Sequence, residues 1–135
     1  LQYSSPEQAR RTLEDGLERS AGDPDLLRAL FALLRQQQAA SRALALSAEL
    51  LDRQPALPPA ARQLAANARA AVLLEQGRWP EAAAVLAGLA PTGDAAEDRR
   101  TRILRADLHR LEGRFAEARA ALAEGGPAPH ADLLR

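Results

Sequence analysis

Hydrophobic residues recur at helical spacing along most of the chain. Leu27, Leu30, Phe31 and Leu34 are separated by one to three positions, and the long segments that follow show the same stripe. This spacing places apolar side chains on one face of an α-helix. No segment alternates apolar and polar residues with the period of two that is typical of a β-strand. The pattern therefore predicts an all-α fold.

Proline and glycine divide this pattern into separate helices. Ser5-Pro6 is a helix start, with serine as N-cap and proline in the first turn, and Asp23-Pro24 restarts the chain. Proline is excluded from helix interiors, so we expect residues 54–59 to form a connection and Pro91–Asp94 to form another. About seven helices are predicted, over roughly residues 6–20, 24–35, 39–54, 60–76, 79–89, 95–112 and 115–124, in an antiparallel up-and-down order.

One stretch of eight residues occurs twice. Residues 75–82, Glu-Gln-Gly-Arg-Trp-Pro-Glu-Ala, return at 111–118 as Leu-Glu-Gly-Arg-Phe-Ala-Glu-Ala. Gly77 and Gly113 follow apolar helical runs, where glycine can take the left-handed conformation that ends a helix. Ala82 and Ala118 are small enough to let two paired helices approach closely. The two copies of the octet therefore predict two helical hairpins, each with a tight turn.

These residues resemble the tetratricopeptide repeat family, whose period is about 34 residues. The turn glycine, the aromatic and the second-helix alanine of that family match Gly77, Trp79 and Ala82, and again Gly113, Phe115 and Ala118. Ala70, Ala106 and Leu73 match its first-helix positions, whereas His109 departs from the expected large residue. In a weaker earlier copy, Gln38 replaces the glycine, Ala40 the aromatic, and Phe31 the small residue.

The resemblance implies an α-solenoid, a right-handed superhelical stack of antiparallel helix hairpins. Under it, residues 1–22 hold the second helix of a preceding repeat, 23–56 a degenerate repeat, 57–93 and 94–125 two repeats, and 126–135 a linker and the start of a further helix. Each repeat would then have the neighbouring repeats of the same chain as packing partners. Because the sequence has no initiating methionine, we expect a fragment of a larger bacterial repeat protein.

Composition narrows the function further. Aromatic residues make up only 3% against 47% hydrophobic residues, so the core must be alanine and leucine. Eighteen basic and eighteen acidic residues give zero net charge, which argues against a nucleic-acid partner and against direct membrane contact. There is no cysteine, and His109 and His130 are too few and too far apart for a metal cage. We therefore expect a protein that is not an enzyme, without catalytic, cofactor-binding or metal-binding residues.

Two features have a plain structural interpretation beside a functional one. Trp79, the single tryptophan, could be a binding hot spot, but its match to the repeat aromatic favours core packing. Arg99, Arg100, Arg102 and Arg105 interleave with acidic residues, and a solvated, ion-paired helix face is the default expectation for them.

In the family, first helices of successive repeats line a concave groove that holds a peptide or a partner's helix. Carried over by position, the partner-binding candidates are Arg28, Arg35, Asn67, Arg100, Asp107 and Arg110, with Ala32, Ala71, Leu74 and Ile103 between them. Arg28, Asn67 and Arg100 resemble part of a clamp for a chain-terminal carboxylate. Ala32 and Leu104 depart from that clamp, because they replace its other asparagine and a basic residue.

The resemblance thus predicts a protein-protein interaction scaffold that holds another protein or peptide in its groove. In bacterial members of this composition the setting is often the envelope, in secretion or exopolysaccharide export, which favours the periplasm over the cytoplasm. The alternative is a peptide-sensing regulatory domain of a cytoplasmic signalling or transcription protein. Both settings come from fold-level analogy.

Overall fold

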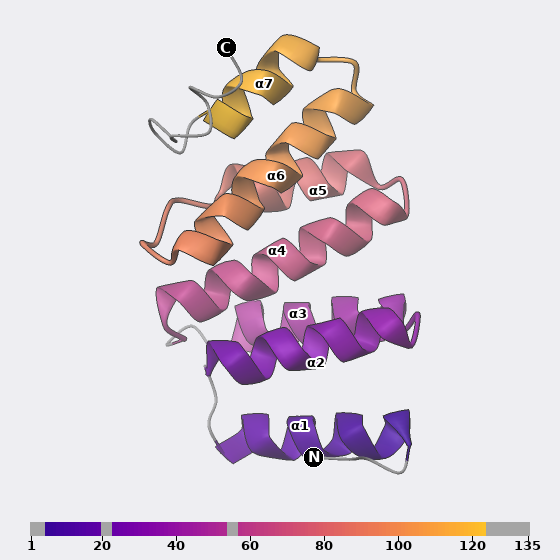
Figure 1. The fold of residues 1–135 in the computed structure, drawn as a ribbon. Coiled ribbons are helices and arrows are strands. Elements are labelled where there is room, and N and C mark those ends of the chain that lie inside the picture. Colours follow the sequence, from indigo (N-terminus) through magenta and orange to yellow (C-terminus); the bar gives the residue numbers. More distant parts are fainter. Residues whose placement is uncertain (1–4, 20–22, 54–56, 124–135) are drawn as a thin grey trace.

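The structure is a computed structural model that describes residues 5–19, 23–53 and 57–123. The described residues form seven α-helices and no strand (Figure 1). The helices are α1 (Pro6–Arg19), α2 (Pro24–Gln36), α3 (Ala40–Arg53), α4 (Pro59–Glu75), α5 (Trp79–Ala87), α6 (Ala95–Leu111) and α7 (Phe115–Ala123). The all-α fold and the seven helices predicted from the sequence are confirmed. The expected connection at 54–59 is shorter at its end, because Pro59 is already the first residue of α4.

The helices follow one another through the molecule in chain order, from α1 at one end to α7 at the other (Figure 1). Each helix packs on the next one along the chain, and α4 also packs on α2 and on α6. As a result α2, α4 and α6 lie side by side in one layer, with α3 and α5 behind them (Figure 1). The hairpins α2–α3, α4–α5 and α6–α7 thus present their first helices on a common face.

The three hairpins turn in the same way. Gln38, Gly77 and Gly113 occupy equivalent turn positions with positive φ angles of 54°, 75° and 80°. In each turn the next residue's N–H reaches back to a carbonyl of the first helix: Ala39 to Leu34 at 2.9 Å, Arg78 to Leu73 at 2.9 Å and Arg114 to His109 at 2.7 Å. The structure therefore places Gln38 in register with the two glycines, although glutamine is strained there.

Small residues let the paired helices approach each other. Ala43, Ala82 and Ala118 stand at the same position after the three turns, and all three are buried. Ala82 is fully enclosed, with 0% of its surface exposed. A larger side chain at these positions would push the second helix of the hairpin away from its neighbours.

The buried apolar residues form two main clusters that meet on α4. One joins α2, α3 and the first half of α4, and includes Leu27, Leu50 and Leu64. The other joins α4, α5 and α6 through Ala70, Leu86, Leu104 and Leu108. Leu57, in the connection before α4, is 7% exposed and belongs to the first cluster, a core role that the proline-rich sequence around it concealed.

The two aromatic residues of the repeated octet have different surroundings. Trp79 is half-buried and packs against the cluster that Leu104 and Leu108 of α6 complete. Phe115 matches the same repeat aromatic but is 61% exposed, so this match does not give it the half-buried surroundings of Trp79. The difference arises because α6 covers the hairpin that contains Trp79, whereas among the described residues no helix follows α7.

Exchanging glutamine and glycine at two of the left-handed turn positions tests whether these positions are equivalent. Replacing Gln38 with glycine should stabilise the fold by up to about 1 kcal/mol, because glycine adopts positive φ without a Cβ clash. Gly77→Gln should destabilise it by about 1 kcal/mol. A Cβ at Gly77 would meet nothing within 4 Å, so this cost comes from the backbone alone. Urea unfolding of both variants measures the two changes, and equal signs would contradict the assigned register.

Overpacking the α4–α5 contact should be costly. Ala82→Leu is expected to lower the free energy of unfolding by roughly 1 to 3 kcal/mol, since the site has no room for three more carbon atoms. Ala84→Leu on the same helix is the matched control, because Ala84 is exposed. Its effect should stay within about 0.5 kcal/mol in the same thermal or urea unfolding measurement. Equal effects of the two substitutions would show that Ala82 is not a close-packing position.

Candidate functional site

The face made by α2, α4 and α6 carries two adjoining hollows. The larger, of about 860 Å³, lies between α2, the beginning of α3, α4 and the beginning of α6. The smaller, of about 270 Å³, lies mainly between α4 and α6. Arg35, Ala71, Glu75 and Arg100 line both hollows, so the two are parts of one feature, which we call the groove.

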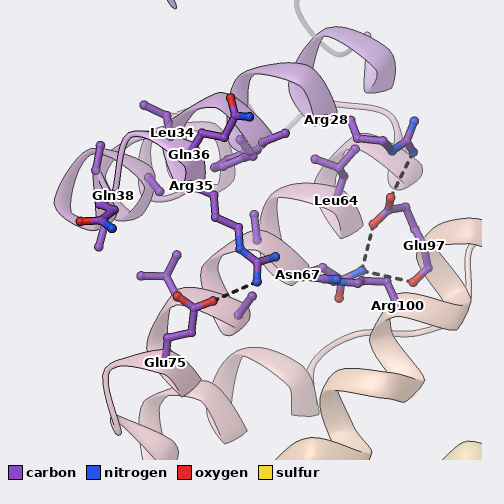
Figure 2. A pocket seen from close by; sticks show the side chains of 18 of the residues that line it. Arg28, Leu34, Arg35, Gln36, Gln38, Leu64, Asn67, Glu75, Glu97 and Arg100 are labelled. Carbon is purple, nitrogen blue, oxygen red and sulfur yellow. Dashed lines mark hydrogen bonds and ion pairs between the residues drawn. The ribbon is translucent and has the colours of Figure 1, made fainter. Parts of the chain in front are cut away.

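The floor of the larger hollow is apolar. Alanine side chains from four helices leave the space open, and larger residues close its base. These apolar lining residues are Phe31, Ala32, Leu34, Ala39, Ala40, Ala43, Leu64, Ala68, Ala71, Val72 and Ala96. Charged and amide side chains stand around this floor (Figure 2). An apolar floor with a few polar groups at its edge is typical of sites that bind ligands or peptides.

All six partner-binding candidates from the sequence line the groove. Arg28 and Asn67 line the larger hollow, Asp107 and Arg110 the smaller one, and Arg35 and Arg100 both. The four apolar candidates between them, Ala32, Ala71, Leu74 and Ile103, line it as well. The structure thus brings together residues from three helices that are up to 82 positions apart in the sequence, from 28 to 110.

Most charges of the groove are already paired with one another. Arg28 Nη2 lies 3.0 Å from Glu97 Oε2, and this hydrogen bond raises the pKa of Arg28 above its ordinary value. Arg35 Nη2 lies 3.5 Å from Glu75 Oε1 and joins α2 to α4 across the groove (Figure 2). Arg110 Nη2 lies 2.8 Å from Asp107 Oδ1. Each of the three carboxylates that line the groove is therefore paired with an arginine of the same lining.

Arg100 is the exception among these arginines. Its side chain is exposed and lines both hollows, and within the described part of the chain it has neither a hydrogen-bond acceptor nor an ion-pair partner. Arg100 is therefore the one arginine of the lining whose guanidinium is left for a ligand, as far as the described residues show.

Asn67 does not point its amide freely into the groove. It is 1% exposed, and its Nδ2 donates to Glu97 Oε1 at 3.1 Å and to the Glu97 carbonyl at 3.2 Å. Its Oδ1 accepts from Thr101 Oγ1 at 2.8 Å. The resemblance of Arg28, Asn67 and Arg100 to a carboxylate clamp therefore fails at Asn67, because its donors and acceptor are used inside the fold.

Asn67 belongs to a buried polar network that sequence reasoning missed. Gln63 Nε2 donates to Asp98 Oδ1 at 2.9 Å and to Thr101 Oγ1 at 3.1 Å, and Gln63 Oε1 accepts from Thr92 Oγ1 at 2.7 Å. Gln63 and Asn67 on α4 therefore bind α6 and the loop before it. The available signal was their spacing of four positions on a helix otherwise rich in alanine, which places both amides on one face.

Two further arginines hold neighbouring helices together. Arg69 Nη1 donates to the Leu44 carbonyl of α3 at 3.0 Å. Arg105 Nη2 donates to the carbonyl of Leu86, in the last turn of α5, at 2.7 Å and to that of Leu89, just after α5, at 2.6 Å. The two arginines stand 36 positions apart, and each joins the first helix of its hairpin to the second helix of the hairpin before it. The expectation of a solvated, ion-paired face is therefore wrong for Arg105, which is half-buried and donates to backbone carbonyl groups at the end of a neighbouring helix.

The described residues contain no cluster of three or more metal-ligating side chains. None of their helices combines the length and the apolar character that crossing a membrane requires.

No protein-family model matches the chain, and comparison with curated proteins and with solved structures finds no significant similarity. The groove therefore has to be interpreted from its own geometry.

The Asp98 carboxylate gives the fold a pH dependence. It accepts from Thr92 N at 2.9 Å, from Gln63 Nε2 at 2.9 Å and from Gly93 N at 3.1 Å, and these bonds lower its pKa. Because the folded pKa is below the unfolded one, the stabilisation is present above pH of about 4 and is lost as the pH falls through the folded pKa. Asp98→Asn should therefore lower the melting temperature at pH 7, and this deficit should be smaller at a pH of about 3.

Asp15, exposed on α1, supplies the control for this measurement. Asp15→Asn should leave the melting temperature nearly unchanged at both pH values. A constant deficit of Asp98→Asn across the whole pH range would mean that the charge of the carboxylate does not contribute.

Proposed function

We propose that this chain is a non-catalytic protein-protein interaction module, a tetratricopeptide-like α-solenoid that holds a segment of another protein in the groove. Three hairpins with the same left-handed turn support the repeat interpretation, and so do their first helices, which begin at residues 24, 59 and 95. Stacking such hairpins with a small rotation between them gives a right-handed superhelix with a concave face. The groove lies on the first helices, where this architecture places its binding surface.

The observation that carries the proposal is the apolar floor of the groove. A hollow of about 860 Å³ is within the range of ligand-binding sites, and its base includes Phe31, Leu34 and Leu64. Covering a concave apolar surface removes it from water and yields about 25 cal/mol per Å² of apolar area buried. The alanines on the floor cannot fill the hollow themselves, so a partner's side chains are needed to gain this free energy.

The charged groups of the groove favour binding over catalysis. Glu75, Glu97 and Asp107 each pair with an arginine of the same lining. A carboxylate held by an arginine at the edge of an apolar floor serves as a fixed hydrogen-bond acceptor, which suits recognition of a partner. We therefore assign these groups to the rim of a binding surface.

The resemblance on which the repeat interpretation rests also supplies the setting of the proposal. In that setting the module recruits a partner protein in a bacterial envelope secretion or exopolysaccharide-export system.

Filling the groove should abolish partner binding without unfolding the protein. Ala32 is exposed on α2 and lines the larger hollow, so tryptophan there should occupy the space intended for a ligand. Peptides selected from a displayed random library on the wild-type protein should bind Ala32→Trp at least about tenfold more weakly, a loss of about 1.4 kcal/mol. Fluorescence anisotropy with labelled peptides measures this change.

Ala29→Trp is the matched control, because Ala29 is exposed on the same helix and does not line either hollow. It should bind the selected peptides as the wild type does, and thermal melts should show both variants folded. Peptides that bind both tryptophan variants equally would place the binding surface elsewhere and overturn the proposed function.

A further inference from the structure

The geometry of the groove points to one class of occupant: an amphipathic helical segment that places large apolar side chains in the larger hollow and an acidic side chain against Arg100. This inference rests on the proposed function, since it takes the groove to be a polypeptide-binding surface. It adds the conformation and the charge of the segment that binds.

The floor of the groove favours a helix over an extended chain. The floor consists of side chains projecting from α2, α3, α4 and α6, whose backbone N–H and C=O groups are already bonded within the helices. The floor itself offers no donor or acceptor, so an extended peptide would have to pair its backbone with the few polar side chains at the edge, and any group left unpaired would be costly. A helix satisfies its own backbone and can present one apolar face.

The size of the larger hollow indicates how many large apolar side chains the occupant must insert. A hollow of about 860 Å³ is comparable to sites that enclose a drug-sized ligand, so a single inserted side chain would leave most of it empty. Two or three large apolar residues at spacings such as i, i+4 and i+7 lie along one side of a helix and can enter the hollow together. The occupant therefore needs leucine-like or phenylalanine-like residues at helical spacing.

Charge decides what flanks this apolar face. Arg28, Arg35 and Arg110 are each within 3.5 Å of a carboxylate that lines the groove, which leaves Arg100 unpaired within the part of the chain that the structure describes. Arg100 lines both hollows and therefore stands beside the apolar floor. A carboxylate from the occupant would form a charge-assisted hydrogen bond there, whereas a lysine would meet an uncompensated positive charge.

The acidic group is assigned to a side chain rather than to a chain terminus. Holding a terminal carboxylate specifically would take several donors that converge on it, but Asn67 donates to Glu97 and Arg28 is paired with Glu97 as well. One exposed arginine at the edge of an apolar floor suits a glutamate or aspartate placed one turn from the apolar anchors.

A library of amphipathic helical peptides tests this directly. Each member is acetylated and amidated, so that it has no terminal charge, and carries leucine or phenylalanine at i, i+4 and i+7. Glutamate, glutamine or lysine occupies the flanking positions. Selection on the wild-type protein should enrich glutamate over lysine, and the best glutamate peptide should bind about tenfold more tightly than its lysine counterpart.

Exchanging the charge at Arg100 should exchange the preference. Arg100→Glu should bind the lysine peptides more tightly than the glutamate peptides, because the sign of the interaction is reversed. Arg99→Glu is the matched control: Arg99 is an exposed neighbour on the same helix that lines neither hollow, and this variant should keep the wild-type preference. Both variants change the net charge equally, so a general electrostatic effect would move them together.

Three results would overturn the inference. The first is equal enrichment of glutamate and lysine on the wild type, and the second is an equal response of Arg99→Glu and Arg100→Glu. The third is binding that appears only in a matched set of the same peptides whose terminal carboxylate is left free. If the peptides that bind still lose binding to Ala32→Trp in these cases, the proposed groove function stands and only the helix-and-acid assignment fails. If no peptide of either set binds, or if none responds to Ala32→Trp, both proposals fail.

Discussion

Close packing around α4 is the constraint on which the rest of this structure depends. This helix contacts α2, α3, α5 and α6, and both main apolar clusters meet on it. Half of its buried residues are alanine, namely Ala61, Ala65, Ala66 and Ala70, so four neighbours can approach one helix. Where alanines of α4 face α2 and α6 instead, as Ala68 and Ala71 do, the same small side chains leave the groove open.

Polar contacts then determine how the first helices lie against each other. Apolar packing between alanine and leucine surfaces is non-directional. Hydrogen bonds from Gln63 and Asn67 to α6, and from Arg69 and Arg105 to the preceding second helices, are directional and buried or half-buried. Leaving any of these groups unpaired would cost about 1 to 3 kcal/mol, which disfavours other arrangements of the same helices. The shape of the groove therefore depends on residues that a ligand would not touch.

The charge pattern of the groove follows from the same arrangement. The protein as a whole is neutral, with eighteen basic and eighteen acidic residues, so long-range attraction cannot choose a partner. Ion pairs between α2 and α4 and between α2 and α6 consume most of the groove's own charges. What remains is a local contrast between an apolar floor and Arg100, and such short-range contrasts give specificity through close contact.

The sequence by itself determined the helices, their boundaries to within a few residues, and the three turns, because these depend on local spacing and on residues such as Pro24, Gly77 and Gly113. The resemblance to a repeat family, carried over by position, also indicated which residues of the first helices would line a groove. Only the tertiary structure decided that Asn67 is buried, that Arg105 binds carbonyl groups and that Phe115 is exposed while Trp79 is covered. Those outcomes depend on which group from another helix lies opposite each side chain, and a single sequence specifies a side chain's own helix far more directly than its neighbour across the interface.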